Sequence, residues 1–295
     1  MKILLFGKNG QVGWELHRSL QPLGDITVLD KEDVDFSEPE TLRTIVSESN
    51  PDIIVNAVAY TAVDKAEEQE VLVNKINAVA PGVLADEALK LGALLVHYST
   101  DYVFDGTKDS PYTETDTPNP NNVYGRTKLG GEQAVQSSGC DYLVFRTSWV
   151  YASRAQNFML TMLKLAQERE ELRIVSDQIG APTSARLIAD TTLLCLQQAV
   201  RERQEGNFSS DLYHLTASGS TSWFGFTEEI VRLVKNGLDV QLKLKELKAI
   251  PTSDYPAPAL RPKNSRLALA KLESQFDIKM PDWKSGLQLC LDEIE

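Results

Sequence analysis

The sequence predicts an α/β protein with a Rossmann-type, doubly wound parallel sheet and a smaller C-terminal domain. Short apolar runs of strand length alternate with segments of helical periodicity through the first half of the chain. This alternation is typical of a parallel sheet covered by helices on both faces. A glycine-rich turn joins the first apolar run to the first helical segment, which is where folds of this class carry a ligand-binding loop.

Five strands are predicted in the first half, at residues 3–6, 26–29, 53–55, 94–98 and 142–145. Helices are predicted between them, at residues 11–20, 41–48, 71–91 and 124–137. Pro81 is expected to kink or break the third helix, because proline lacks a backbone N–H. Residues 1–150 are therefore predicted to form a Rossmann domain whose ligands lie at the carboxyl ends of the strands.

The pattern is less regular after residue 150. Helices are predicted at residues 158–170, 185–201 and 223–234, and short strands at residues 173–175, 213–215 and 247–250. The segment 250–262 contains four prolines and is expected to be an extended loop. We interpret residues 151–295 as a mainly substrate-binding domain that lends some elements back to the Rossmann sheet.

The composition narrows the class of partner. The 295-residue chain has a formal net charge of −12, which argues against nucleic acid or an anionic membrane as the partner. No apolar stretch approaches the roughly 18 residues that a membrane span needs.

The three cysteines are widely spaced and form neither a disulfide framework nor a metal motif: Cys140, Cys195 and Cys290. We therefore expect a cytoplasmic protein with reduced thiols.

The glycine-rich turn has the pattern of a dinucleotide-binding loop. Gly7, Gly10 and Gly13 would permit a tight turn, close approach of a pyrophosphate and close packing of helix against strand. Asp30 ends the second predicted strand, where a carboxylate can bond the adenosine ribose. Asp30 favours NADH, whereas the neighbouring Lys31 keeps NADPH open. The alternative is a turn that merely connects two elements, with Asp30 as a helix cap.

Tyr124 and Lys128 are placed four residues apart on a predicted helix and therefore share one face. Reduction of a carbonyl needs a proton for the alkoxide, and a free tyrosine, with a pKa of about 10, exchanges one reluctantly at neutral pH. A nearby cation lowers such a pKa. Tyr124 is therefore the candidate general acid, and Lys128 is the group that would tune it and hold the nicotinamide ribose.

Thr100 follows the fourth predicted strand, and its hydroxyl could bond both the substrate carbonyl and the Tyr124 phenol. The alternatives are a turn capped by Thr100 and an ordinary amphipathic helix that carries Tyr124 and Lys128. His97 is interpreted as a core residue. Because the three histidines form no cluster, no metal site is predicted.

These motifs resemble the extended short-chain dehydrogenase/reductase superfamily. Within it, five runs distributed over the chain resemble the dTDP-4-dehydrorhamnose reductase family: MKILLFGKNGQVGWE, YSTDYVF, NVYGRTK, RTSWVY and RPKNSRL. The resemblance implies NAD(P)H-dependent reduction of the 4-keto group of dTDP-4-dehydro-L-rhamnose, which gives dTDP-L-rhamnose.

The resemblance also implies roles for individual residues. The cofactor would be bound at the strand ends, with the adenosine and pyrophosphate contacted by Gly10, Gln11, Val12, Asp30, Asp35 and Phe36. The rest of the cofactor would be lined by Ala59, Tyr60, Thr61, Tyr98, Tyr124 and Lys128. The sugar substrate would meet Thr100, Asp101 and Trp149.

A pyrophosphate bound to an acidic protein needs local cations. We hypothesise that Arg261, Lys263 and Arg266 supply them for the dTDP-sugar. The alternative is that these three side chains are ordinary solvated charges.

Some members of the family are dimers linked through magnesium bound by glutamates. Glu15 matches one of these glutamates, but a second position is Arg186 in this chain, and Mg²⁺ prefers carboxylates and water to arginine. The metal-linked dimer is therefore not expected, and both a monomer and a homodimer stay open.

Two other functions stay open. A nucleotide-sugar dehydratase or epimerase is the nearest enzyme, but dehydratases have a glutamate where this chain has Tyr102, and an epimerase would not consume NAD(P)H. A non-catalytic, dinucleotide-binding regulatory subunit is the alternative from another class. The presence of Thr100, Tyr124 and Lys128 together argues for catalysis.

Overall fold

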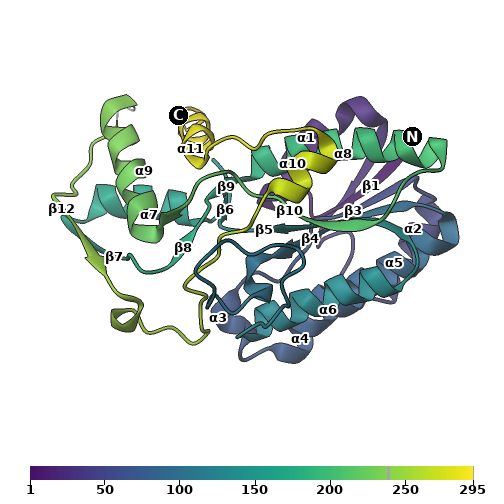
Figure 1. Ribbon diagram of the computed structural model, residues 1–295, viewed down its shortest axis with the longest axis horizontal. Helices are drawn as coiled ribbons and strands as arrows, with labels where there is room; N and C mark the ends of the chain where they lie inside the picture. Colours follow the sequence, from purple (N-terminus) through teal and green to yellow (C-terminus); the bar gives the residue numbers. More distant parts are fainter. Residues whose placement is uncertain (238–239, 295) are drawn as a thin grey trace.

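A six-stranded sheet with the order β10-β5-β4-β3-β1-β2 lies at the centre of the molecule (Figure 1). The computed structural model describes residues 1–237 and 240–294. Every neighbouring pair in this sheet is parallel. The strands are β1 (Lys2–Phe6), β2 (Asp25–Leu29), β3 (Ile53–Asn56), β4 (Leu94–Thr100), β5 (Asp141–Thr147) and β10 (Asp211–His214). The predicted parallel α/β sheet is confirmed.

Both faces of the sheet are apolar, because successive residues of a strand point to opposite sides. Ile3 and Leu5 of β1 belong to one buried cluster, and Leu4 and Phe6 belong to another. The first cluster includes residues of α1 (Gln11–Ser19), α8 (Ala185–Glu205) and α10 (Ala270–Phe276). The second includes residues of α2 (Thr41–Ser49), α5 (Ala80–Leu91) and α6 (Val123–Ser137). Figure 1 shows these two layers on opposite sides of the sheet.

Pro81 does not break the helix predicted for residues 71–91. The chain runs through α4 (Glu70–Asn74), a π-helical turn (Lys75–Val79) and α5 without leaving helical geometry. The wider π turn lies directly before the proline-bearing first turn of α5. A local change of pitch is a known way to accommodate a missing backbone donor.

A third buried cluster lies beside the sheet. It includes residues of three helices: α7 (Phe158–Glu168), α9 (Trp223–Gly237) and α11 (Trp283–Leu291). It packs on a parallel pair of strands, β7 (Glu171–Val175) and β12 (Glu246–Ile250). The segment between Ile250 and Pro262 is extended except for the 3₁₀ turn Thr252–Asp254, largely as predicted. The remaining short elements are α3 (Val63–Ala66), β6 (Val150–Tyr151), β8 (Ile179–Gly180), β9 (Thr183–Ser184), β11 (Thr221–Ser222) and two further 3₁₀ turns, Gln21–Leu23 and Asp101–Val103.

The second half of the chain contributes β10, α8 and α10 to the sheet layers. The domain division at residue 150 stays a prediction, because the two halves of the chain share these layers. The sequence pattern did not predict α3, α10, α11 or the four two-residue strands.

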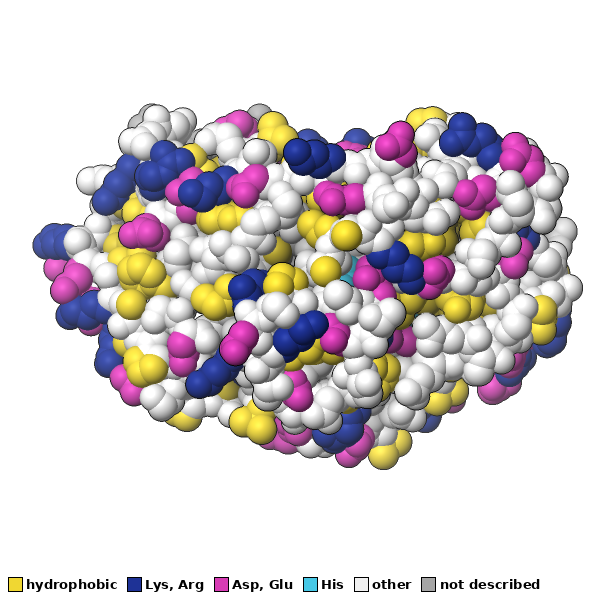
Figure 2. All heavy atoms as spheres, viewed as in Figure 1, with side chains coloured by type: hydrophobic (Ala, Val, Ile, Leu, Met, Phe, Trp, Pro, Cys, Tyr) yellow, Lys and Arg dark blue, Asp and Glu magenta, His cyan; other side chains and the backbone are white. Residues whose placement is uncertain are grey.

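The surface carries charges of both signs. On the face shown in Figure 2, acidic and basic side chains are interspersed and not segregated into separate areas. Among the described residues, none of the helices is both long and apolar enough to cross a membrane.

Candidate active site

The turns that follow β1, β3, β4 and β5 meet at one edge of the sheet, because parallel strands end on the same side. In the sheet, β2 and β3 lie on opposite sides of β1, so the chain moves in one direction from β1 to β2 and in the opposite direction from β2 to β3. This change of direction opens a crevice at the carboxyl ends of the strands, where ligands of such sheets bind.

The glycine-rich loop leads from β1 into α1. Gly7 has a φ of +90°, and a Cβ at Gly13 would lie 1.9 Å from the Gly7 carbonyl oxygen. Gly10 is the N-cap of α1 and provides no side-chain cap. The N–H groups of the first turn therefore have no intrahelical acceptor and are available to an anion at the positive end of the helix dipole.

A cavity of about 190 Å³ lies beside this loop. Its lining includes five of the predicted cofactor residues: Asp30, Asp35, Phe36, Ala59 and Tyr60. The carboxylate of Asp30 accepts the backbone N–H of Asn9 at 2.7 Å and so joins the loop to the end of β2. Phe36 packs edge-on against Phe6, with ring centroids 5.4 Å apart, and is mainly part of the core.

Asn77 holds the segment that lines this cavity, and sequence analysis missed it. It lies in the π-helical turn and is fully buried. Its Oδ1 accepts the N–H of Tyr60 at 2.8 Å, and its Nδ2 donates to the Tyr60 carbonyl at 3.2 Å and to Thr127 Oγ1 at 3.3 Å. A polar side chain in mid-helix four residues before Pro81 was the available signal.

The side chain of Tyr98 lies in the core, and its implied contact with the cofactor stays a prediction. Its ring is buried in the cluster under α1 and α8, and its hydroxyl hydrogen-bonds to Thr192 at 2.8 Å. Only its backbone faces the candidate site, because its carbonyl accepts the Nζ of Lys128 at 2.6 Å.

Tyr124 and Lys128 lie one turn apart on α6, as predicted. The helix starts at Asn122, whose Oδ1 accepts the Gly125 N–H at 2.7 Å, and this N-cap fixes the position of Tyr124. Lys128 is 2% exposed, so its hydrogen bond to the backbone of β4 is made inside the protein. Thr100, at the end of β4, lies close enough to Tyr124 to act on its pKa. The structure thus brings the three predicted catalytic residues together.

Burial dominates the electrostatics of this group. It raises the pKa of Tyr124 to about 12, although Thr100 acts in the opposite direction. Desolvation is the main cause of this shift and Lys128 is not among its causes, so the expectation that Lys128 lowers the pKa of Tyr124 stays a prediction. Burial also lowers the pKa of Lys128 to about 8, partly offset by Glu132 one turn further along α6. At neutral pH the phenol keeps its proton and can act as a donor.

Asp101 is buried beside Thr100. Its Oδ1 accepts the Thr100 hydroxyl at 3.1 Å, and its Oδ2 has no hydrogen-bond partner among the described residues. Burial raises the pKa of this carboxyl to about 6. An unpaired, buried carboxylate oxygen is a suitable acceptor for a sugar hydroxyl.

Trp149 forms the neighbouring wall with a residue that sequence analysis missed. Its backbone has a φ of +49°, and its indole stacks on Trp223 with ring centroids 3.5 Å apart and an angle of 7° between the planes. Gly180 lies under the ring, since a Cβ there would come within 2.5 Å of it. Trp223 is in turn fixed by a hydrogen bond from its Nε1 to Gln178 Oε1 at 3.1 Å.

Arg261 lies in the wall of a cavity of about 630 Å³ that Trp223, Gln178 and Tyr255 also line. It is not a free cation, because its guanidinium makes two hydrogen bonds to Asp64, at 3.1 and 2.7 Å.

The two other predicted phosphate ligands do not form a cluster with Arg261. Arg266 is bonded to Asn264 and to the carbonyl of Asp109, so its role is structural. Lys263 is exposed. The hypothesis that these three cations bind the substrate pyrophosphate stays a prediction.

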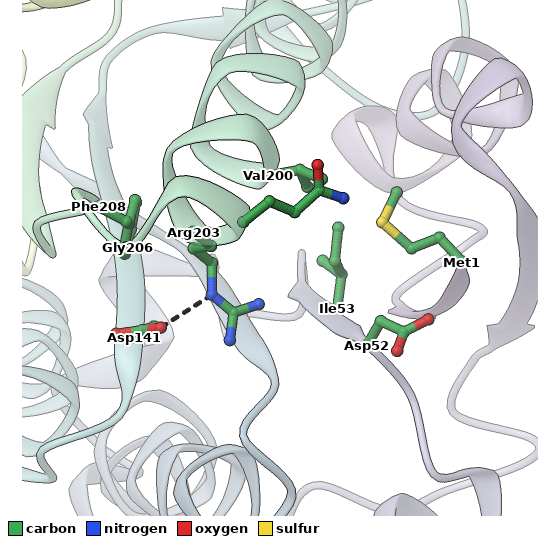
Figure 3. A pocket seen from close by; sticks show the side chains of 9 residues that line it. Met1, Asp52, Ile53, Asp141, Val200, Arg203, Gly206 and Phe208 are labelled. Carbon is green, nitrogen blue, oxygen red and sulfur yellow. Dashed lines mark hydrogen bonds and ion pairs between the residues drawn. The ribbon is translucent and has the colours of Figure 1, made fainter.

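Another hollow, of about 540 Å³, lies at the opposite edge of the sheet (Figure 3). Met1 and Asp52 precede strands there and Asp141 begins one, and Arg203 reaches in from α8 to pair with Asp141 at 2.8 Å. Its position at the amino ends of the strands separates it from the loops described above. The described residues also hold no group of three or more His, Cys, Asp or Glu side chains placed to bind a metal.

A Rossmann-type sheet with a glycine-rich phosphate loop and a Thr–Tyr–Lys group at its carboxyl edge defines an NAD(P)-dependent oxidoreductase of the short-chain dehydrogenase/reductase type. The chain belongs to the family described as RmlD substrate binding domain, whose model matches residues 1–295.

Relatives and solved structures agree with this assignment. A dTDP-4-dehydrorhamnose reductase from Burkholderia thailandensis is 52% identical over 297 residues, covering 100% of this chain and 99% of the relative. The crystal structure of a dTDP-4-dehydrorhamnose reductase from Clostridium acetobutylicum has a TM-score of 0.87 and 38% identity and covers 99% of both chains. The enzyme of that name from Bacillus anthracis, solved in complex with NADP, has a TM-score of 0.88 and 34% identity, again with 99% of both chains covered.

Proposed function

We propose that this protein reduces the 4-keto group of dTDP-4-dehydro-L-rhamnose to give dTDP-L-rhamnose, with NADH or NADPH as the reductant. The observation that carries the proposal is the placement of Tyr124, Lys128 and Thr100 together at the carboxyl edge of the sheet. Full-length similarity to reductases of this name supports the substrate.

The residues present fit a dinucleotide. A side chain at Gly13 would collide with the Gly7 carbonyl, so the loop keeps the close approach that a pyrophosphate requires. The cavity lined by Asp30 and Tyr60 would receive the adenosine end. The bound nicotinamide would supply a hydride to the keto carbon.

The chain's own residues would handle the proton. Tyr124, neutral at pH 7 because burial raises its pKa, would donate its phenolic proton to the oxygen that gains negative charge. Thr100 would hold the same oxygen by a hydrogen bond. Lys128 is fixed to the backbone of β4, and its ammonium would stabilise the resulting phenolate until it is reprotonated.

Asp101 and Trp149 would bind the sugar, the first by its unpaired oxygen and the second by its apolar face. Arg261 would meet the pyrophosphate by exchanging its contact with Asp64 for one with the phosphates, which are suited to a guanidinium fork. A cytoplasmic location and a monomeric or homodimeric state stay predictions.

The experiment is to follow NADH and NADPH oxidation with dTDP-4-dehydro-L-rhamnose, for the wild type and for Tyr124→Phe. We expect turnover in the wild type and a loss of about 10²- to 10⁴-fold in kcat for the variant, the usual contribution of a general acid. Dinucleotide affinity should be nearly unchanged. If the wild type binds dinucleotide but turns over neither cofactor, the protein acts on another sugar or as a regulatory subunit.

A further inference from the structure

Arg186 lies where two acidic side chains from opposite ends of the chain meet. It is in the first turn of α8, and its guanidinium forms ion pairs with Glu15 of α1 and with Glu293, which follows α11. The distance from Nε to Glu15 Oε2 is 3.5 Å, an ion-pair contact in which Nε makes no hydrogen bond among the described residues. Ser153 donates a hydrogen bond to the other oxygen of Glu293 at 3.0 Å. Three helices that are distant in sequence are thus joined through one side chain.

The charges at this junction are only partly exposed. The Glu15 side chain is 4% exposed, so its charge needs a partner inside the protein. Arg18 provides one at 2.8 Å but is shared with Asp190, also at 2.8 Å. The carboxylates of Glu15, Asp190 and Glu293 therefore share two guanidinium groups, those of Arg18 and Arg186. Arg186 is the group that reaches from the buried carboxylate to the C-terminal segment.

A divalent metal ion does not fit this arrangement. Mg²⁺ requires an octahedron of oxygen ligands at about 2.0–2.1 Å, whereas the space between Glu15 and Glu293 is filled by a guanidinium that pairs with both. The cavity beside it, of about 140 Å³, is lined by Arg186 itself and by the carboxylates of Glu15, Asp190 and Glu293, but the described residues hold no group of three or more His, Cys, Asp or Glu side chains placed to bind a metal.

We propose that Arg186 is a built-in cation that takes the place of a metal ion at the junction of α1, α8 and α11. A guanidinium can bridge two carboxylates because it has donors on several sides. The attachment of α11 to α1, the helix that carries the phosphate loop, is therefore independent of divalent cations in this protein. The inference does not depend on the proposed reaction.

The test is thermal unfolding of the full chain in EDTA and in MgCl₂ at matched ionic strength. We expect the wild type to melt at the same temperature in both and to keep one oligomeric state in both by analytical ultracentrifugation. Arg186→Gln should melt lower by a few degrees, because Glu15 and Glu293 lose their shared partner. Arg232→Gln is the matched control, since the exposed Arg232 pairs with only one carboxylate, Glu229 of the same helix, and should lower the melting temperature less than Arg186→Gln does.

Arg186→Glu sharpens the test, because it places a third carboxylate between Glu15 and Glu293. We expect this variant to melt lower than the wild type in EDTA and to recover when Mg²⁺ is added. The proposal is overturned if the wild type melts lower in EDTA, if Arg186→Gln melts like Arg232→Gln, or if a folded Arg186→Glu does not respond to Mg²⁺. If Arg186→Glu does not fold, the comparison of Arg186→Gln with Arg232→Gln still decides.

Discussion

The two walls of the candidate active site are built in different ways. One wall, which we call the sheet-edge wall, consists of the Gly7–Gly13 loop, Thr100, Tyr124 and Lys128, and each of its parts directly follows or covers a strand of the parallel sheet. The other, the aromatic wall, consists of Trp149, Trp223 and Arg261. These three residues come from segments more than 30 positions apart. Trp149 and Trp223 each border a two-residue strand, β6 and β11, which pair with β9 and β8.

The two walls differ in what positions their functional groups. In the sheet-edge wall, backbone geometry positions the chemical groups, as in the bond from Lys128 to the Tyr98 carbonyl. In the aromatic wall, side chains position one another, as in the stack of Trp149 on Trp223. Substitutions in the first wall should therefore affect cofactor binding and chemistry, and substitutions in the second should mainly affect the KM for the sugar.

The largest effect is expected for Gly13→Ala in the sheet-edge wall. Its Cβ would lie 1.9 Å from the Gly7 carbonyl oxygen, and backbone must move to relieve such a clash, at a cost beyond the roughly 1–3 kcal/mol of ordinary overpacking. We expect a lower melting temperature and no measurable dinucleotide binding by fluorescence titration.

Gly10→Ala is the matched control within the same loop. Its Cβ would meet only the Gly7 oxygen, at 3.3 Å, so the variant should fold with nearly the stability of the wild type while binding dinucleotide less tightly. Equal melting temperatures for the two variants would contradict the packing argument.

Sequence patterns predicted the sheet-edge wall because its signals are local. Gly7, Gly10 and Gly13 stand in one turn, and the spacing of Tyr124 and Lys128 is that of one helical turn. The pKa of Tyr124 could not be predicted in the same way, because it depends on how deeply the phenol is buried.

The aromatic wall could be predicted only in part. Trp149 was found through a family resemblance, but its partner Trp223 lies 74 positions away and is brought to it by the packing of α9. Nor does any local pattern show that Arg261 is paired with Asp64, almost 200 positions earlier. Contacts at such separations are set by tertiary structure, which periodicity does not report.

The next effect concerns Arg261 in the aromatic wall. If its guanidinium exchanges Asp64 for the substrate pyrophosphate, Arg261→Ala should raise the KM for the dTDP-sugar by about tenfold or more, the usual value of a hydrogen bond to a charged group. Asp64→Asn keeps the shape of the partner and weakens the competing ion pair, so it should leave this KM unchanged or lower it. Steady-state kinetics that show the same rise in KM for both variants would assign Arg261 a purely structural role.

A smaller effect is expected for Trp223→Ala. Loss of the stacked partner leaves Trp149 free to reorient, and aromatic pairs contribute about 0.5–1.5 kcal/mol beyond the area that they bury. We expect the KM for the sugar to rise by about two- to tenfold with the affinity for dinucleotide unchanged. Trp223→Phe preserves part of the stack and should lie between the wild type and the alanine variant. A change in dinucleotide affinity of the same size would show that the two walls are not separate.

The last prediction concerns stability alone and separates the electrostatics of the sheet-edge wall from its geometry. Burial lowers the pKa of Lys128 from 10.5 to about 8, so between these pH values the unfolded chain binds more protons than the folded one, and the free energy of unfolding rises with pH. The penalty for the buried charge is complete below about pH 8 and disappears toward pH 10.5. Lys128→Met removes it, so the difference in unfolding free energy between variant and wild type, measured in urea, should change with pH across this window. Lys164→Met, at a lysine whose side chain is 75% exposed, is the control for the loss of a lysine. A difference that is flat with pH for Lys128→Met would mean that burial leaves its pKa near the ordinary value.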